Sequence, residues 1–207
     1  DNLIDTVRNN LDLLQRHAEL KKEILGIDKL YAYDLYMPVT KTESPEISFE
    51  EAKEHVLEAL KPLGQEYVEK VRTALEDERW VDVYENKGKR SGAYSGGSYD
   101  SKPFILMNYQ EDMNSMYTLI HELGHSMHSH NTNKSQPYHY SDYTIFQAEV
   151  ASTTNEALLT KHLLDTIEDE EFRKHVLSHA LENIKGTLFR QTMFCEFEHW
   201  LHKELEK

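Results

Sequence analysis

The sequence predicts a mainly helical protein that also contains a small β-sheet. Apolar residues recur at three- and four-residue steps along most of the chain, which is the spacing of one face of an α-helix. Residues 103–109, PFILMNY, instead form a short and mainly apolar run that is typical of a strand. Residues 85–103 hold four of the eight glycines and separate this strand from the preceding helices.

The composition limits the classes of partner. The chain has 207 residues, which fits one large domain or one domain with an attached helical layer, and 39% of them are hydrophobic, enough for a core of ordinary size. Its formal net charge of -14 argues against binding to nucleic acid or to an anionic membrane, because both depend on clustered Lys and Arg. No apolar run approaches the roughly 20 residues of a membrane-spanning helix. The single cysteine, Cys195, fits a reducing compartment, so we expect a cytoplasmic protein; its oligomeric state is unknown.

The two ends of the sequence suggest a fragment of a longer protein. Asp1 opens directly onto a pattern typical of the middle of a helix, and the last eleven residues contain no Gly or Pro that would end one. Within the chain we expect four parts: a helical layer at 1–80, a Gly-rich loop with strands at 81–110, two long helices at 111–165 and C-terminal helices at 166–207.

Residues 1–80 are predicted to contain two helical stretches. The apolar face of the first stretch comprises Leu3, Val7, Leu11, Leu14 and Ala18. Residues 26–46 contain two prolines and are expected to be extended or irregular. The second stretch begins at Ser48, which forms a capping box with Glu51. Its expected inner face comprises Phe49, Ala52, Val56, Leu60, Leu63, Tyr67, Val71 and Leu75. Pro62 lies inside this pattern and predicts two helices or one kinked helix.

Capping residues and turns mark the later helices. Asp112 is the expected N-cap of a helix that ends near His130. Residues 131–143 are expected to form a loop, and a second long helix follows at 144–164. One or two further helices run to the end of the chain, with Gly186 as a weak point.

The stretch HELGH, in the helix after Asp112, is a candidate zinc site. Residues four apart lie on the same helix face, so the rings of His121 and His125 can bind one ion. Glu122 lies next to His121 and can reach a water molecule on that ion. In this arrangement zinc acidifies the water, Glu122 takes its proton, and the hydroxide attacks a carbonyl that the metal polarises.

A solvated, His-rich helix face without metal would give the same short pattern. Two features favour the metal site. Apolar residues flank the motif at helical spacing, which indicates one buried side: Met113, Met116, Tyr117, Ile120 and Met127. Gly124 costs about 1 kcal/mol of helix stability relative to Ala, so its presence suggests that another segment packs tightly beside His125.

A catalytic zinc site needs a third protein ligand. His128 lies about 10 Å along the helix axis from His121, too far to share an ion, so His128 and His130 are expected to support the site or to be exposed. The next helix offers Glu149, among small residues that permit close helix packing, and Glu156 two turns later. One could bind the ion while the other orients a His ring, although each could be an exposed helical glutamate.

Several motifs resemble the oligoendopeptidase F family, which belongs to the thimet-oligopeptidase-like zinc peptidases. The resembling stretches run in order along nearly the whole chain: DLYMP, VYENKGKRSGAY, HELGHSMHS, QPYHYSDYTIFQAEVASTTNEALL and RQTMFCEFEHWLH. The resemblance implies a zincin-like core of the gluzincin type, with HExxH, a Glu on the following helix and one Zn2+ per chain. It implies that His121, His125 and Glu149 bind the ion, that Glu122 is the general base, and that Glu156 orients a ligand.

Residues for substrate binding are less specific. The strand at 103–109 could be an edge strand that pairs with an extended peptide, or an ordinary buried strand. The Gly-rich loop lacks the phosphate-loop pattern, and the resemblance places it near the peptide-binding cleft. Candidate substrate-binding or oxyanion-stabilising residues are Tyr94 in that loop and Tyr138, His139, Tyr140 and Tyr143 between the two long helices, although aromatic residues there are more often packing residues.

We therefore predict a zinc-dependent endopeptidase that hydrolyses short, unstructured peptides. The resemblance implies a narrow channel that excludes folded proteins. It also implies that the family's transition-state Tyr and His residues lie beyond Lys207, so the chain corresponds to the zinc-bearing core. The alternatives are a non-catalytic zinc- or peptide-binding helical module and a His-rich helical protein without metal.

Overall fold

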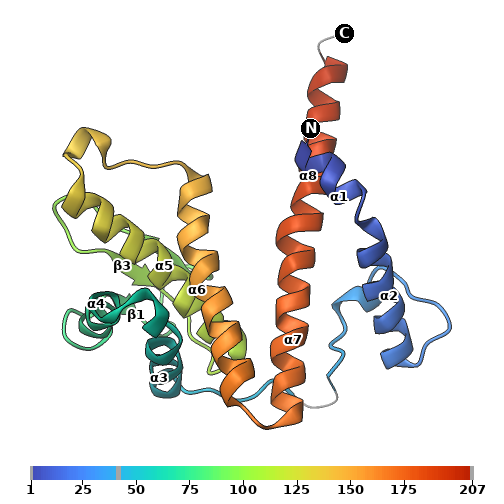
Figure 1. The fold of residues 1–207 in the computed structure, drawn as a ribbon, viewed down its shortest axis with the longest axis horizontal. Helices are drawn as coiled ribbons and strands as arrows, with labels where there is room; N and C mark the ends of the chain where they lie inside the picture. Colours follow the sequence, from blue (N-terminus) through green and yellow to red (C-terminus); the bar gives the residue numbers. More distant parts are fainter. Residues whose placement is uncertain (1, 41–42, 206–207) are drawn as a thin grey trace. The chain divides into compact units, whose positions relative to one another are not determined.

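The computed structural model describes residues 2–40 and 43–205 (Figure 1). The chain is mainly helical with one small three-stranded sheet, as the sequence predicts. It divides into two compact units: unit 1 comprises residues 1–43 and 169–207, and unit 2 comprises residues 44–168. No helix in the described ranges is long and apolar enough to cross a membrane.

Unit 2 opens with a helical pair. Its helices are α3 (Phe49–Ala59) and α4 (Gln65–Glu76). The predicted capping box begins α3: Ser48 Oγ accepts from the Glu51 N–H at 3.3 Å, and the Glu51 carboxylate accepts from the Ser48 N–H at 2.9 Å. Pro62 lies in a separate 3-10 turn, so the interruption produces two helices. The expected inner-face position of Leu63 is wrong: Leu63 lies in this turn, outside the helical spacing, and is 39% exposed.

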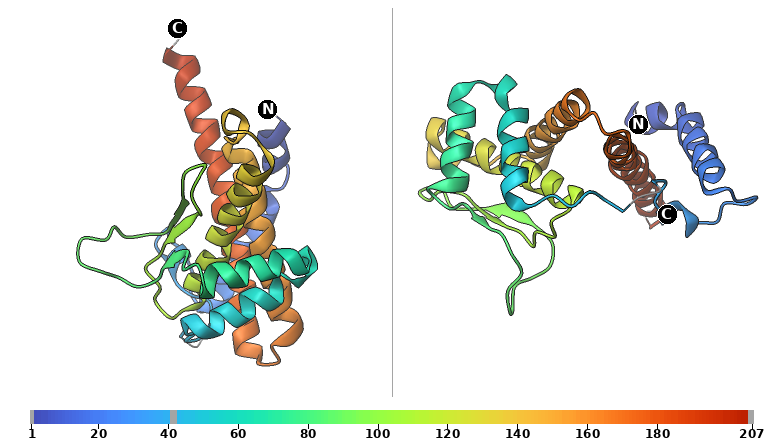
Figure 2. Two further views of the ribbon diagram at one scale, coloured as in Figure 1. Left: turned by 90° about the vertical axis from the view of Figure 1, so that its left-hand side faces the viewer. Right: turned by 90° about the horizontal axis from the view of Figure 1, so that it is seen from below.

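The sheet of unit 2 has three short strands. They are β1 (Val81–Asp82), β2 (Tyr94–Gly96) and β3 (Phe104–Leu106), in the order β1-β3-β2. The buried Ile105 lies opposite Val81 in the parallel β1 and opposite Ser95 in the antiparallel β2. Of the two alternatives for residues 103–109, the edge strand is therefore wrong, because β3 has a hydrogen-bonded neighbour on both sides. The two edge strands are β1 and β2, and β2 comes from the Gly-rich segment. Figure 2 shows the segment between β1 and β2 as a loop that projects from the sheet.

The central helix of unit 2 is α5 (Met113–Ser135). Asp112 is its N-cap, as predicted, and the Asp112 side chain accepts a hydrogen bond from the Ser115 N–H at 2.7 Å. The helix continues beyond His130 to Ser135, so the loop expected from residue 131 begins later. The reason is local: no helix-breaking Gly or Pro follows His130 until Pro137.

A second long helix, α6 (Ile145–Thr166), packs against α5 (Figure 1). Its N-terminus is fixed by a capping box between Thr144 and Gln147. The connection from α5 to α6 contains a 3-10 turn at Tyr138–Tyr140. Because α5 contacts α3, α6, β2 and β3, its apolar residues form the middle of the core: Met113, Met116, Tyr117, Leu119, Ile120, Leu123 and Met127 are all buried.

Unit 1 is formed by helices from both parts of its sequence. They are α1 (Asn2–Arg8), α2 (Leu11–Leu25), α7 (Glu170–Ile184) and α8 (Arg190–Leu205), with a 3-10 turn at Asp34–Tyr36. The apolar spacing predicts one helix over residues 3–18, whereas the structure has a break at Asn10. The Asn10 side chain donates to the Thr6 carbonyl at 2.8 Å, and such a side-chain bond competes with the helical backbone pattern. Val7 is buried, but Leu3 and Leu11 are 56% and 43% exposed.

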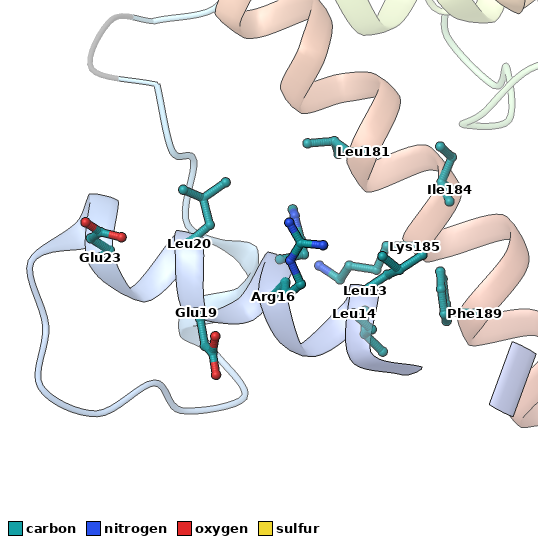
Figure 3. A pocket seen from close by; sticks show the side chains of 11 residues that line it. Leu13, Leu14, Arg16, Glu19, Leu20, Glu23, Leu181, Ile184, Lys185 and Phe189 are labelled. Carbon is teal, nitrogen blue, oxygen red and sulfur yellow. The ribbon is translucent and has the colours of Figure 1, made fainter. Parts of the chain in front are cut away.

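A π-helical turn at Lys185–Phe189 joins α7 directly to α8. The predicted weak point, Gly186, therefore marks a change of helix type instead of a loop. Between α2 and this region lies a pocket of about 610 Å³, which Figure 3 shows from close by. Its lining is mainly aliphatic and aromatic, from Leu13, Leu14, Leu20, Leu181, Ile184 and Phe189. Beside it, Lys21 is buried and lies 3.3 Å from the Glu182 carboxylate.

Candidate metal centre

Two imidazole rings converge in the middle of α5. His121 and His125 are one helical turn apart, and their Nε2 atoms lie 3.1 Å from each other. The two rings are close to perpendicular, with centroids 4.7 Å apart and an interplanar angle of 86°. The helical spacing of HELGH therefore brings two nitrogen atoms together at one point on the helix surface.

Glu149 brings a carboxylate from α6 to the same point. Its Oε2 lies 3.6 Å from His121 Nε2, and its Oε1 lies 3.8 Å from His125 Nε2. The Glu149 side chain is 47% exposed, so the cluster of donor atoms is open to solvent on this side. Within the described ranges this is the one group of three His, Cys, Asp or Glu side chains close enough to hold one ion, with donor atoms within 4.8 Å of one another.

The donor set has the chemistry of a zinc site. Imidazole nitrogen and carboxylate oxygen are common zinc ligands, and donors about 2.0–2.2 Å from a tetrahedral ion lie about 3.3–3.6 Å apart. The separations of 3.1, 3.6 and 3.8 Å between the three side chains are close to this value. Three protein donors leave a fourth position open, which is the arrangement of catalytic zinc sites. The residues therefore fit a zinc ion.

Glu156 contacts His121 from the other side of the ring. Its Oε1 lies 2.5 Å from His121 Nδ1, and only 13% of the Glu156 side chain is exposed. A proton held on Nδ1 by this contact leaves the lone pair on Nε2, which faces Glu149 and His125. Burial alone would lower the pKa of His121, but the hydrogen bond and charge of Glu156 outweigh it, so the pKa is raised.

His125 has its own orienting contact. The ring makes a hydrogen bond with the backbone carbonyl of Ala148 on α6. Burial and the charge of His121 together lower the pKa of His125, although Glu149 and this hydrogen bond act in the opposite direction. A lowered pKa favours the neutral ring, which is the form that binds a metal.

Glu122 lies on the inner side of α5 and is only 7% exposed. Burial raises the pKa of its carboxyl group, and the nearby charge of His121 only partly counteracts this. The backbone N–H of Ser95, on the edge strand β2, donates a hydrogen bond to this carboxylate. The Ser95 hydroxyl also lies 2.7 Å from the hydroxyl of Ser126 on α5. Sequence reasoning missed both serines, because a Ser in a predicted loop carries no spacing signal that links it to a helix.

The two helices approach each other very closely at Gly124. A Cβ atom at Gly124 would lie 2.6 Å from the Ser152 Cα and 2.9 Å from the Ala151 carbonyl oxygen. This confirms the expectation that another segment packs tightly beside HELGH and that small residues of α6 allow it. Next to this contact, Asn155 Nδ2 donates to the Ile120 carbonyl at 3.2 Å. The position of Glu149 relative to α5 therefore depends on a backbone-to-backbone contact.

Other histidines of α5 have separate surroundings. His128 packs edge-on against Tyr143, with ring centroids 4.3 Å apart, and the Tyr143 hydroxyl lies 2.5 Å from the Ser129 hydroxyl. His130 lies against Trp80, with centroids 5.7 Å apart, and burial lowers its pKa. Neither contact involves the three-residue cluster.

The remaining candidate residues are solvent-exposed. Tyr94 on β2 is 56% exposed, and Tyr138 and Tyr140 are 75% and 67% exposed. In the 3-10 turn, the Tyr138 ring packs against Tyr99, and the His139 ring packs against Tyr140. These ring contacts do not join the side chains to the metal cluster, and their role in substrate binding stays a prediction.

Comparison with known sequences identifies relatives along the whole chain. The model of peptidase family M3 matches residues 1–207. The chain is 52% identical over 207 residues to oligopeptidase PepF of Bacillus subtilis. This match covers all of this chain and 31% of PepF. It is 49% identical over 202 residues to group B oligopeptidase PepB of Streptococcus agalactiae. This second match covers 98% of this chain and 33% of PepB. The chain thus spans about a third of the length of the curated relatives it matches.

Solved structures share the fold. A structure from Chlamydophila abortus matches 99% of this chain and 34% of its own chain, with a TM-score of 0.88 and 40% identity. The structure of oligoendopeptidase-F from Enterococcus faecium matches all of this chain and 28% of its own, with a TM-score of 0.65 and 39% identity. These matches confirm the resemblance on which the predicted fold class depends.

Proposed function

This chain belongs to peptidase family M3, and from that membership we propose that unit 2 holds the zinc centre of an oligoendopeptidase. The observation that carries the proposal is the convergence of His121, His125 and Glu149 beside the buried carboxylate of Glu122. The names of the relatives, oligopeptidase and oligoendopeptidase, support short peptides as the substrate class. The expected cytoplasmic location and the expected lack of nucleic-acid binding stay predictions.

His121, His125 and Glu149 would hold one Zn2+ per chain. When bound, the ion supplies Lewis acidity, which polarises the peptide carbonyl and increases the acidity of water. Glu156 and the Ala148 carbonyl hold the two imidazole rings through atoms other than those that face the cluster. These contacts fix the ring orientations before an ion arrives, and so reduce the reorganisation that binding needs.

Glu122 would act as the general base. Its raised pKa makes it a better proton acceptor than an ordinary exposed carboxylate, so it can take a proton from the attacking water. The same carboxyl group can later give that proton to the amine of the departing peptide half. The hydrogen bond from the Ser95 N–H holds the carboxylate in position and connects it to β2.

The edge strand β2 is the proposed receptor for the peptide backbone. β2 pairs with β3 on one side only, and its exposed residue Tyr94 lies at its start. An extended peptide that adds to such an edge is held by main-chain hydrogen bonds, which accept many sequences. Because Ser95 also contacts Glu122, a peptide on β2 would lie near the proposed base. Tyr138, His139 and Tyr140 stay candidates for additional substrate contacts.

The test is cleavage of a quenched fluorescent peptide together with zinc content. We expect Glu122→Gln to lower the rate by about 10²–10⁴-fold, the usual contribution of a general base, while zinc content stays at one per chain. Glu66→Gln is the matched control, because the Glu66 side chain on α4 is 95% exposed. An unchanged rate in Glu122→Gln would refute its role as the base.

A non-catalytic zinc- or peptide-binding module is the second candidate. It is favoured by the observation that the chain spans only about a third of the relatives' length. This candidate predicts one bound zinc and no cleavage by the unaltered chain. Lack of zinc in the unaltered chain, even after zinc is added, would reject the oligoendopeptidase centre and the zinc-binding module, and would leave only a peptide-binding module.

A further inference from the structure

A second pair of imidazoles lies in unit 2, outside the proposed zinc centre. His55 on α3 places its Nδ1 3.3 Å from the Nε2 of His162 on α6. The ring centroids are 5.6 Å apart and the rings are inclined by 59°. Both residues are partly exposed, so a small ion can reach the two nitrogen atoms from solvent.

The separation of these nitrogens matches a shared metal ion. Two nitrogen ligands about 2.0–2.1 Å from a tetrahedral zinc ion lie about 3.3–3.4 Å apart. The His55–His162 distance of 3.3 Å falls in this range, as the 3.1 Å between His121 and His125 nearly does. We propose that His55 and His162 form a second, weaker site for a transition-metal dication such as Zn2+, with water filling the remaining positions.

The protonation of the pair supports this assignment. Burial lowers the pKa of His55, although the charges of Glu51 and Glu54 partly oppose it. Burial also lowers the pKa of His162, and the neighbouring His55 lowers it further. Neutral imidazoles offer lone pairs, and imidazole is a ligand that suits Zn2+, Ni2+ and Cu2+.

The charges around the pair favour a cation. Four carboxylates act on the two rings, from Glu51, Glu54, Glu58 and Asp165. Two of them are paired with ammonium groups, Glu58 with Lys61 and Asp165 with Lys161, so the carboxylates still outnumber these cations. A local excess of negative charge raises the concentration of cations at such a surface. None of these carboxylates completes a three-residue donor group in the described ranges, so we expect weaker binding than at the first centre.

The second pair is spatially separate from the first centre. His162 lies thirteen residues after Glu149 on α6, about 20 Å along the helix axis at about 1.5 Å per residue. An ion held by His55 and His162 would join α3 to α6, two helices that already pack against each other. Occupancy would therefore brace the helix that carries Glu149 without entering the proposed active site.

Zinc titration by calorimetry distinguishes the two sites. We expect the unaltered chain to show one tight and one weaker class of zinc binding. His55→Asn and His162→Gln keep a polar atom near the lost nitrogen, and each should weaken the second class by about 10-fold or more, because half of its protein ligands are removed. The tight class should stay unchanged in both variants.

Two further variants serve as controls. His199→Gln removes an exposed imidazole on α8, and it should leave both classes unchanged. His121→Ala should remove the tight class and leave the weaker one, so failure of the proposed zinc centre and failure of this second site give different results.

Specific results would contradict a metal site at His55 and His162. A neutral imidazole pair that only shares a hydrogen bond would also give a 3.3 Å contact. In that case the unaltered chain shows one class of zinc binding, or the weaker class survives both His55→Asn and His162→Gln. If either variant does not fold, imidazole NMR signals of the unaltered chain decide: zinc must shift those of His55 and His162 together, and unshifted signals overturn the proposal.

Discussion

Two glutamates on α6 illustrate how surroundings separate residues of the same type. The Glu149 side chain is 47% exposed and lies near both imidazoles, whereas the Glu156 side chain is 13% exposed and contacts the far side of the His121 ring. Burial of an unpaired carboxylate is unfavourable, so the less exposed residue requires the partner that the structure gives it. The two residues should therefore respond differently to substitution.

We predict that Glu149→Ala lowers zinc affinity more than Glu156→Ala. Loss of an orienting partner typically weakens metal binding by about 10–100-fold, and loss of a direct ligand should exceed this. Competition with a chromophoric chelator measures both affinities. Thr154→Ala on the same helix is the control, since this residue is exposed. Equal losses in the two Glu variants would contradict the assigned roles.

At the residue scale, unit 1 offers a prediction about pH. Burial would raise the pKa of Glu182, but hydrogen bonds from Lys185 and His17 outweigh it, so the pKa lies below the ordinary value for a glutamate. A carboxyl group whose pKa is lowered by folding adds stability above its unfolded pKa, and this stability is lost as pH falls through the folded pKa. Glu182 should therefore stabilise unit 1 at neutral pH and cease to do so well below pH 4.5.

The corresponding test compares Glu182→Gln with the unaltered chain. At pH 7 we expect faster amide exchange in α2 and α7 of the variant, because the buried Lys21 ammonium loses its carboxylate partner and retains the Leu35 carbonyl. The difference should shrink in acid, where the unaltered carboxyl group is itself neutral. Glu198→Gln on α8 is an exposed control. A difference that persists unchanged in acid would show that packing, and not charge, is responsible.

At the scale of elements, the spacing of α5 and α6 depends on Gly124. Replacement by Ala would normally stabilise a helix by about 1 kcal/mol. Here the new methyl group would meet backbone atoms at 2.6 and 2.9 Å, so we predict that Gly124→Ala destabilises unit 2 by about 1–3 kcal/mol. It should also weaken zinc binding, because displacement of α6 moves Glu149 away from the imidazoles.

Gly186 provides the matched control for this substitution. It also lies in a helical segment, but a Cβ atom there would have no neighbour within 4 Å. Gly186→Ala should therefore leave stability equal or slightly higher in denaturant unfolding, with zinc affinity unchanged. Equal behaviour of the two Ala variants would indicate that the close approach at Gly124 does not control the helix spacing.

The elements also show which features a sequence can predict. Asp112, Ser48 and the HELGH spacing act within a few residues, so helix starts and the approach of His121 to His125 follow from local rules. The middle position of β3 and the contact of Ser95 with Glu122 depend on segments distant in sequence, and no periodicity encodes them. Spacing alone also left Glu149 and Glu156 as equal candidates for the third ligand.

At the scale of the whole molecule, zinc should contribute to stability. An ion shared by α5 and α6 binds the folded state only, and at a free concentration 100 times its Kd it adds about 2.7 kcal/mol. We predict that a chelator lowers the unfolding temperature of the unaltered chain by several degrees. His121→Ala is the control, in which the chelator should have little effect. An unaltered chain that melts at the same temperature with and without chelator would argue against a bound ion.

The sequence does not predict the division into two units, because this division depends on contacts between segments that are distant in sequence. Apolar spacing describes each helix by itself, and it predicts neither that residues 1–43 pack with residues 169–207 nor that α3 belongs with α5 and α6. Only the contacts between distant segments define these units.

This division has a consequence for the order of events during synthesis and folding. The three proposed zinc ligands, His121, His125 and Glu149, and the orienting residue Glu156 all lie in the hairpin formed by α5 and α6. They therefore leave the ribosome close together. Local contacts form faster than contacts that require closure of a long loop. Unit 1 must wait for its second segment, which begins only at residue 169. Because metal-binding energy at such a site is also folding energy, zinc available to the nascent chain would favour the hairpin before the two segments of unit 1 meet.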